Sequence, residues 1–306
     1  MIQSTVDSHA TQVTIPLRRN GWLSFFRNVV EVLWANKKSR AGIIMLGVFV
    51  GTAVLGPFFA PYSAADTSFT ANLTFSPQHW LGTTQAGQDV LSQLIVGTRL
   101  SLISAFAVGG IATVLSCAVG LSAGYAGGWT DEILSFVTNV FLVMPSLPLL
   151  IVIASYAPGK GIGLTILIVS LTSWPWGARV LRSQAVSLKT RDFVTSAELI
   201  GDRMGRILLR EIFPNMLSLV MANFFGASSF GLLTVVGLQF LGLGDPNATS
   251  WGSMLYWANN SGALLNGQWA WIVAPGMCIA LLGMSLVLLN FGIDALSNPR
   301  LREELR

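Results

Sequence analysis

The chain of 306 residues is 52% apolar, has a mean hydropathy of +0.63 and contains only 10% charged residues. A soluble domain has about 25% charged residues and a disordered chain has low hydropathy, so both classes are excluded and a membrane protein is predicted. The net charge of +4 would indicate nucleic-acid binding only if the basic residues formed one patch, and they are spread along the chain. Cys117 and Cys278 lie inside apolar runs, which is typical of packing residues rather than of a disulfide or a zinc site.

Six apolar runs are long enough to cross a bilayer core of about 30 Å, which needs roughly 20 residues in a helix. We therefore predict an all-α, polytopic membrane protein with six transmembrane helices. The first run begins about forty residues into the chain and is longer than the apolar part of a signal peptide, so we expect it to be a true span. The runs are Ala41–Phe59, one within Leu100–Thr130, one within Ile133–Gly159, Ile162–Ala178, about Met216–Gly237 and about Trp271–Ile293.

The basic residues predict the orientation, because short cytoplasmic loops retain Lys and Arg. Sixteen of the 18 basic residues lie in the N-terminal tail, in the loop after the fourth run or in the C-terminal tail, and only Arg99 and Lys160 lie elsewhere. Both termini are therefore expected in the cytoplasm. The predicted parts are a cytoplasmic tail (1–40), a six-helix domain (41–293) with a cytoplasmic loop (179–215) and exterior loops (60–100 and 238–269), and a second cytoplasmic tail (294–306).

The predicted spans contain no Asp, Glu, Lys, Arg or His. Ion-coupled transporters and voltage sensors place such groups at membrane depth, so their absence indicates that the energy source lies outside this chain. Pro145 and Pro148 interrupt the third run and predict a kink, which either lines a pathway or only bends the helix. Glycines at the spacing of helix contacts occur as Gly120, Gly124 and Gly128 and as Gly47 with Gly51, and they either mark packing faces or reflect the frequency of glycine in spans.

The polar loop 179–215 has the pattern of two short amphipathic helices separated by Gly201, the first from about Phe193 and the second ending before Pro214. Their apolar face could lie on lipid, with Arg203, Arg206 and Arg210 at the headgroups. Alternatively, it could insert into a groove on another protein. Periodicity alone leaves both possibilities open.

Within this loop, TSAELIGDRMGRILLREIFPN (195–215) resembles the coupling-loop signature of ABC importer permeases, in which a proline follows a glycine thirteen residues later, as Pro214 follows Gly201. HWLGTTQAGQDVLSQLIVGTRLSL (79–102), GLQFLGLGDPNATSWGSML (237–255), WAWIVAPG (269–276) and NFGIDALSNPR (290–300) are similar to the C-type permease of the dipeptide, oligopeptide and nickel importer family. The chain departs from that pattern at Thr84, where Asp is common, at Gln88, where Arg is common, at Thr195 and at Glu211.

The resemblance implies a type I ABC importer permease fold in the cytoplasmic (inner) membrane of a prokaryote. The implied partners are a second, B-type permease, one or two cytoplasmic nucleotide-binding ATPase subunits that hold ATP and Mg, an extracytoplasmic substrate-binding protein and the lipid bilayer, with no nucleic acid. No cofactor, metal or catalytic residue is expected on this chain itself. The residues that the resemblance implies in coupling to the ATPase are Thr195, Ser196, Ala197, Glu198, Leu199, Ile200, Gly201, Arg203 and Pro214.

The resemblance implies a path for peptides, with nickel or metal chelates, haem-like compounds and oligosaccharides as alternative substrates. The chain has no G-x-x-x-x-G-K-[ST] motif for ATP, which fits a pore driven by separate ATPase subunits. A membrane-embedded enzyme is the second hypothesis, but the two histidines, His9 and His79, belong to no catalytic motif. His79, next to Trp80, is expected at the surface or at an interface rather than as a metal ligand. A secondary transporter is the third, and it lacks the buried ionisable groups expected of one. The adjacent Asp131 and Glu132 are expected in a solvated turn.

Overall fold

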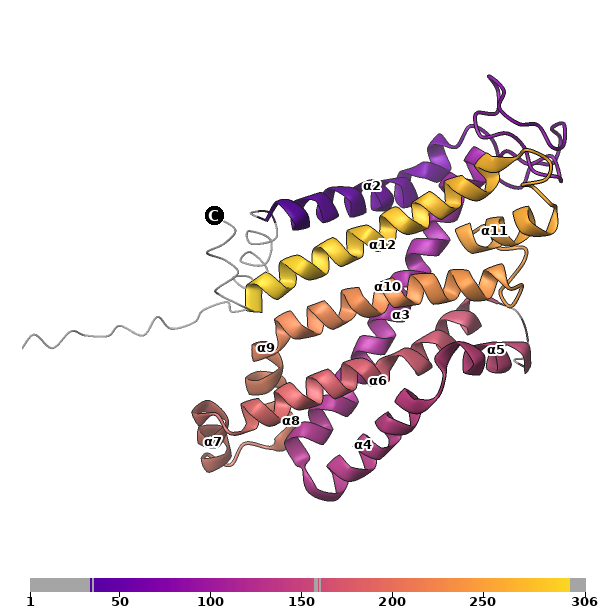
Figure 1. Ribbon diagram of the computed structural model, residues 1–306. Coiled ribbons are helices and arrows are strands. Elements are labelled where there is room, and N and C mark those ends of the chain that lie inside the picture. Colours follow the sequence, from indigo (N-terminus) through magenta and orange to yellow (C-terminus); the bar gives the residue numbers. More distant parts are fainter. Residues whose placement is uncertain (1–33, 35, 157–158, 160, 298–306) are drawn as a thin grey trace, which may run out of the picture.

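The structure, a computed structural model, describes residue 34, residues 36–156, residue 159 and residues 161–297. Most of the predicted tails, residues 1–33, 35 and 298–306, therefore lie outside the described part. Within the described ranges the chain is helical, without strands, and one isolated bridge joins Thr83 and Asp89. The five longest helices form a bundle (Figure 1). Four of them lie side by side in the order α2 (Lys37–Phe59), α12 (Trp269–Ser297), α10 (Leu217–Phe240) and α6 (Ile162–Lys189), and α3 (Val90–Ala126) crosses them obliquely.

These five helices are long and apolar enough to cross a membrane. A sixth crossing would be made by α4 (Gly128–Val143) together with α5 (Ser146–Tyr156), which are bent by 89° relative to each other. The predicted third span is therefore not one straight helix. Met144 before Pro145 is extended, with φ −67° and ψ 132°, because a proline ring disfavours the helical conformation in the residue before it. Pro148 falls in the first turn of α5, where its missing N–H costs no helical hydrogen bond.

Small residues let α3 cross α6 and α10 closely at the centre of the bundle. A Cβ on Gly120 would lie 2.6 Å from the Ala178 carbonyl oxygen of α6, and one on Gly124 would lie 2.7 Å from the Arg182 carbonyl oxygen. The predicted packing face is thus confirmed for this pair, since only glycine fits against the α6 backbone there. A Cβ on Gly47, on Gly51 or on Gly128 would meet nothing within 4 Å, so these glycines make no such contact within the described part.

Two helices extend beyond the apolar runs that predicted them. Asp89 caps α3 by accepting a hydrogen bond from the Ser92 N–H at 2.8 Å, so the helix starts ten residues before Leu100 and includes Arg99. α6 continues from Ala178 to Lys189 through part of the predicted loop, because arginine, leucine and lysine are good helix formers even where the run is no longer apolar. The loops predicted as 60–100 and 179–215 are correspondingly shorter.

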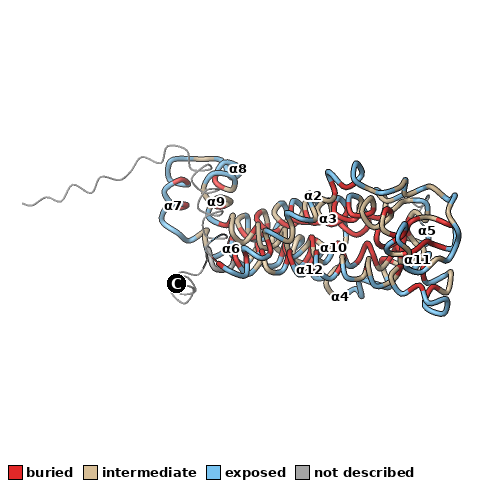
Figure 2. Tube along the Cα trace, turned by 90° about the horizontal axis from the view of Figure 1, so that it is seen from above, coloured by how far each residue is buried: buried red, intermediate tan, exposed pale blue. Residues whose placement is uncertain are grey.

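The two ends of the bundle differ. One end, which we call the loop end, carries the short helices α7 (Asp192–Leu199), α8 (Met204–Ile207) and α9 (Phe213–Asn215) together with a π-helical turn, η1 (Leu208–Ile212). The start of α2 and the end of α12 lie at this end as well (Figure 1). The opposite end carries the α2–α3 connection and α11 (Trp251–Asn260). Figure 2 shows buried residues along the bundle and mostly exposed ones around α7.

The opposite end is held by buried polar and aromatic contacts that periodicity did not predict. Trp251 at the start of α11 is fully buried; its backbone N–H donates to Ser101 Oγ at 3.1 Å and its Nε1 to the Leu94 carbonyl at 3.2 Å. His79, expected at the surface, is 6% exposed, and its Nδ1 lies 2.9 Å from Asp89 Oδ1. A surface position for His79 was therefore wrong, because the imidazole pairs with the buried Asp89 carboxylate, while the adjacent Trp80 is 66% exposed.

Candidate functional site

The segment predicted to couple to a partner lies at the loop end, and its residues 192–215 have the predicted form of helix, glycine and helix. We call it the coupling segment. α7 ends at Leu199, Gly201 has φ +87°, and α8 begins at Met204. The Gly201 N–H donates to the Glu198 carbonyl at 3.0 Å, and the Asp202 N–H donates to the Ala197 carbonyl at 3.1 Å. This pair of bonds is a Schellman motif, whose left-handed position is normally glycine. Gly201 is thus required by the backbone conformation of the turn.

One face of this segment packs against the rest of the chain. Val194 and Ala197 of α7 and Ile207 of α8 are buried, in a cluster with Leu121 of α3 and Leu181 of α6. The two possibilities left open by periodicity, lipid and a foreign groove, therefore do not describe this face. It is covered by the ends of α3 and α6, which fix the segment to the bundle. Ala197, predicted to contact the ATPase, is 7% exposed and belongs to the buried face.

The tip of the segment exposes two large apolar side chains on either side of the α7 C-terminus. Leu199 is 84% exposed and Ile200 is 82% exposed, immediately before the Gly201 turn. The predicted residues Thr195, Ser196, Gly201 and Arg203 are exposed too. An exposed apolar pair on a rigid turn is a suitable contact for another protein, because its burial would release water from apolar surface. We call Leu199 and Ile200 the apolar tip.

Polar contacts fix the orientation of the two short helices. Tyr125 at the end of α3 donates its hydroxyl to Glu198 Oε1 at 2.8 Å, and Lys189 Nζ lies 5.4 Å from the centre of the Tyr125 ring. Arg206 Nη1 lies 3.1 Å from Asp202 Oδ1, one turn apart along the chain. Glu198, predicted as a coupling residue, therefore has a partner within its own chain. Its carboxylate joins the coupling segment to the end of α3.

Pro214 follows the π-helical turn and precedes α10. A proline has no N–H to donate to the carbonyl four residues earlier, and a π-helical turn is a common local adjustment near such a break. The Asn215 side-chain amide donates to the Glu211 carbonyl at 2.6 Å. Pro214 is only partly exposed, so it shapes the return of the chain into the bundle rather than the apolar tip.

Pro145 and Pro148 lie apart from the coupling segment, at the α4–α5 bend. Both are exposed in the isolated chain. The bend that they predicted is present. Their role in lining a pathway stays a prediction, because the exposed side of the bend is not covered by any described residue of this chain.

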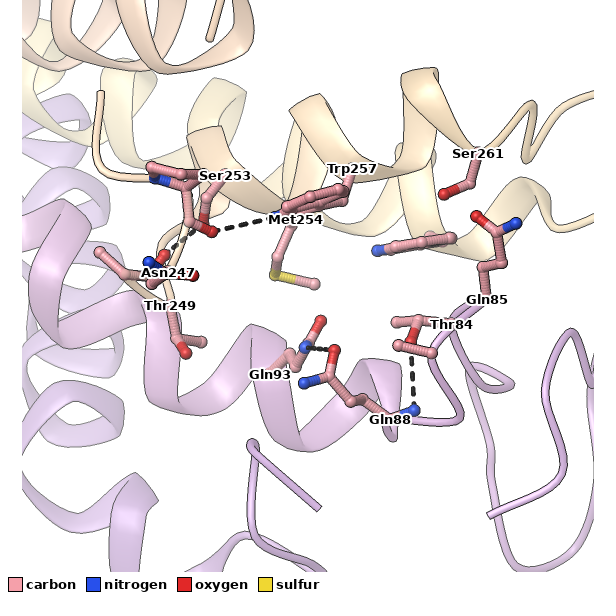
Figure 3. A pocket seen from close by; sticks show the side chains of 14 residues that line it. Thr84, Gln85, Gln88, Gln93, Asn247, Thr249, Ser253, Met254, Trp257 and Ser261 are labelled. Carbon is pink, nitrogen blue, oxygen red and sulfur yellow. Dashed lines mark hydrogen bonds between the residues drawn. The ribbon is translucent and has the colours of Figure 1, made fainter. Parts of the chain in front are cut away.

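The opposite end of the bundle contains a pocket of about 580 Å³ (Figure 3), which sequence analysis did not predict. It lies between the start of α3 and α11, and its walls come from segments more than 150 residues apart. Gln93 Nε2 donates to Gln88 Oε1 at 2.8 Å, and the Gln88 N–H donates to Thr84 Oγ1 at 3.1 Å. Facing them, Trp257 of α11 donates its Nε1 to the Pro246 carbonyl at 2.9 Å.

The pocket lining is uncharged. It offers the side-chain amides of glutamine and asparagine, hydroxyl groups and two indole rings, and its lining residues are Thr84, Gln85, Ala86, Gln88, Gln93, Pro246, Asn247, Ala248, Thr249, Ser253, Met254, Trp257, Ser261 and Trp271. Trp271 is 3% exposed, and its Nε1 has no hydrogen-bond partner among the described residues. Thr84 and Gln88, two of the positions at which the sequence departs from the resembled pattern, both line this pocket.

No group of three or more His, Cys, Asp or Glu side chains that could hold a metal ion occurs in the part of the chain that the structure describes. Asp131, expected in a solvated turn, instead lies in the first turn of α4 and accepts two hydrogen bonds from Arg182, from Nε at 2.5 Å and from Nη2 at 2.6 Å. This pair is a salt bridge between α4 and α6. Its geometry, two parallel bonds between a guanidinium and a carboxylate, is typical of structural pairing.

Known proteins match nearly the whole chain. The family model described as "Binding-protein-dependent transport system inner membrane component" matches residues 116–303, and the model "N-terminal TM domain of oligopeptide transport permease C" matches residues 24–77. The dipeptide transport system permease protein DppC of Bacillus subtilis is 30% identical over 288 residues, covering 92% of this chain and 87% of the relative.

Two further relatives have similar coverage. The oligopeptide transport system permease protein OppC of Bacillus subtilis is 28% identical over 284 residues, covering 92% of each chain. The glutathione transport system permease protein GsiD of Pectobacterium atrosepticum is 28% identical over 287 residues, covering 93% of this chain and 91% of the relative. The first family model covers more than half of the chain, including the coupling segment. This chain therefore belongs to the binding-protein-dependent transport system inner membrane components and is a multi-pass permease subunit of the dipeptide and oligopeptide type.

Proposed function

We propose that this chain forms, with a second permease, the translocation pathway of an ATP-driven importer of peptides in the inner membrane of a bacterium. The observation that carries the proposal is the structure of the coupling segment. Its turn at Gly201 exposes the apolar tip, and its buried face packs against the ends of α3 and α6. Such a segment transmits force, because a push on α7 is passed to two spanning helices through a packed core. The permease relatives support the same reading.

In this mechanism the apolar tip inserts into a cleft on a nucleotide-binding subunit. ATP binding brings two such subunits together, and the tip follows their movement. The bundle thereby shifts between states that open to opposite sides of the membrane, as expected for a packed unit with two arrangements. ATP and Mg are held by the partner subunits, and the chain itself supplies no catalytic group.

We further propose that the loop end faces the cytoplasm and that the opposite end faces outward, toward an extracytoplasmic binding protein. The distribution of basic residues supports this orientation, since the loop-end segment and the regions flanking α2 and α12 carry most of them. Cysteine substitution tests it with a membrane-impermeant thiol reagent on intact cells. Trp80→Cys should be labelled from outside and Leu199→Cys only after the cells are opened, and the reverse pattern would contradict the orientation.

Peptide is the proposed substrate class because the relatives are named as permeases for dipeptides, oligopeptides and glutathione. The uncharged pocket at the opposite end is compatible with this class, since amides and hydroxyls bind a peptide main chain and indole rings bind its side chains. Uptake of a labelled dipeptide by proteoliposomes containing the whole complex tests the proposal. No uptake of the dipeptide, together with ATP-dependent uptake of a labelled nickel chelate, haem-like compound or oligosaccharide, would assign one of the alternatives.

The coupling itself is tested by Leu199→Asp, which places a charge on the apolar tip. Because Leu199 is 84% exposed, its replacement leaves the fold of the free chain intact. Leu265→Asp is the matched control, since Leu265 is 93% exposed but lies at the opposite end. We expect Leu199→Asp to reduce co-purification of the ATPase subunits at least about tenfold, the effect of a loss of roughly 1.4 kcal/mol, and Leu265→Asp to leave it unchanged. Equal retention in both variants would refute the coupling role.

A further inference from the structure

A second cavity of about 260 Å³ lies between α3, α4 and α6, in the half of the bundle nearer the loop end. Its wall combines small residues of α3 with polar residues of α4 and two arginines of α6: Gly120, Ala123, Thr138, Asn139, Arg179 and Arg182. We call it the arginine crevice. It shares no lining residue with the pocket at the opposite end or with the coupling segment.

The two guanidinium groups in the crevice have different partners. Arg182 is paired with the Asp131 carboxylate through two hydrogen bonds, and that carboxylate also accepts a bond from Ser135 Oγ at 2.9 Å. Arg179 donates from Nη2 to Asn139 Oδ1 at 2.6 Å, which is a neutral amide oxygen. Among the described residues that line the crevice, one positive charge is therefore left without a carboxylate.

The Arg179 guanidinium, which has no carboxylate partner among the described residues of the crevice, would be stabilised by a bound anion. Arg179 directly follows the apolar run of α6, and charged side chains in spanning helices pair with counter-charges or reach toward the headgroup layer. Asn139 holds the guanidinium at the crevice while leaving most of its five N–H donors for other acceptors. Basic pockets between transmembrane helices are suitable sites for the head groups of anionic lipids.

The surroundings favour a lipid phosphate over other anions. Trp176 lies one helical turn before Arg179 and is 67% exposed, and Trp129 at the start of α4 is 81% exposed. Indole rings favour the depth of the headgroups. On its outer faces, α4 also exposes the apolar side chains of Ile133 and Phe136, as expected of a helix in contact with lipid. The volume also fits, because 260 Å³ is below the range of about 300–1,000 Å³ typical of ligand pockets and suits a single phosphate group.

We propose that the arginine crevice binds the phosphate of an anionic phospholipid. Arg179 donates charge-assisted hydrogen bonds to the phosphate oxygens, and Asn139 positions its guanidinium. The Arg182–Asp131 bridge keeps α4 and α6 at the distance that forms the crevice. The acyl chains extend from the crevice into the surrounding bilayer. This binding depends neither on the identity of the transported substrate nor on the ATPase subunits.

Native mass spectrometry of the full chain, purified in detergent with the subunits that accompany it, tests the proposal. The protein is titrated with phosphatidylglycerol, with zwitterionic phosphatidylcholine and with inorganic phosphate. We expect the wild-type chain to prefer phosphatidylglycerol to phosphatidylcholine by about tenfold, as for one charge-assisted contact. Inorganic phosphate at equal concentration should not displace the lipid. Displacement by phosphate, or equal retention of the two lipids, would overturn the proposal without any variant.

Substitutions then locate the site. Arg179→Gln should remove the preference, whereas Arg99→Gln, which removes an exposed arginine from α3 near the opposite end, should retain it. Asn139→Asp is a nearly isosteric second variant that supplies an internal carboxylate to Arg179, so it should remove the preference while the number of arginines stays constant. A preference that survives in both Arg179→Gln and Asn139→Asp, or that is lost equally in Arg99→Gln, would place the lipid elsewhere.

Discussion

Replacement of Gly201 by alanine tests the turn that carries the apolar tip. Gly201 has φ +87°, and a Cβ built on it would meet nothing within 4 Å, so the substitution acts through backbone conformation alone. A non-glycine residue in this region costs about 1–2 kcal/mol. Gly205 of α8 is the matched control, because its Cβ would also meet nothing and its φ is outside the left-handed region. Alanine there is expected to be neutral or to stabilise the helix by about 0.5–1 kcal/mol.

Hydrogen exchange of the peptide that spans the turn measures this difference locally. The amides of Gly201 and Asp202 are bonded to the carbonyls of Glu198 and Ala197, so both exchange only when the turn opens. A loss of 1–2 kcal/mol corresponds to about 5- to 30-fold faster exchange in Gly201→Ala. Gly205→Ala should exchange like the wild type. Gly201→Asn should fall between them, since asparagine tolerates the left-handed region. Equal exchange in Gly201→Ala and Gly205→Ala would refute the reasoning.

Three other substitutions test the bundle. Gly124→Val should destabilise the protein by about 1–3 kcal/mol through overpacking against α6, whereas Gly47→Val should leave the thermal unfolding temperature in detergent unchanged, and equal shifts would contradict the assigned crossing. Trp251→Ala should cost about 3–5 kcal/mol, because it empties the centre of a buried cluster, while Trp129→Ala at an exposed position should be nearly neutral in the same melt. Asp89→Ala removes the α3 cap and the partner of a buried imidazole, so we expect a loss of about 1–3 kcal/mol and earlier proteolysis of the α2–α3 connection; unchanged protease resistance would count against the cap.

The predicted helical bundle follows from patterns that act over short distances. Runs of apolar residues located the five helices that are long and apolar enough to cross a membrane and the bent α4–α5 pair, and the prolines at 145 and 148 located the bend. Helix ends were less predictable, because they depend on single contacts. α3 starts at Val90 through the Asp89 cap, which stands one residue before the helix and could have been recognised from the sequence as a capping residue. α11 was missed although Ser250 and Ser253 form a capping box at its start.

The candidate site was predictable in outline and not in its contacts. The Gly201 turn and the two helices around it followed from the spacing of apolar residues, but that spacing could not separate Val194 and Ala197, which are buried, from Leu199 and Ile200, which are exposed. The distinction depends on α3 and α6, whose ends cover one face of α7. The arginine crevice and the uncharged pocket join residues from distant segments. No local pattern in a single sequence reports such contacts.

The central claim is that the apolar tip contacts an ATPase subunit, and site-specific photo-crosslinking tests it most directly. A benzophenone side chain at Leu199 is compared with one at Trp80, an exposed position in the connection at the opposite end. The assembled complex is irradiated in its native membrane. We predict that position 199 crosslinks to the nucleotide-binding subunit and that position 80 does not. Crosslinking of position 199 to lipid alone or to the binding protein, or of position 80 to the nucleotide-binding subunit, would contradict the account.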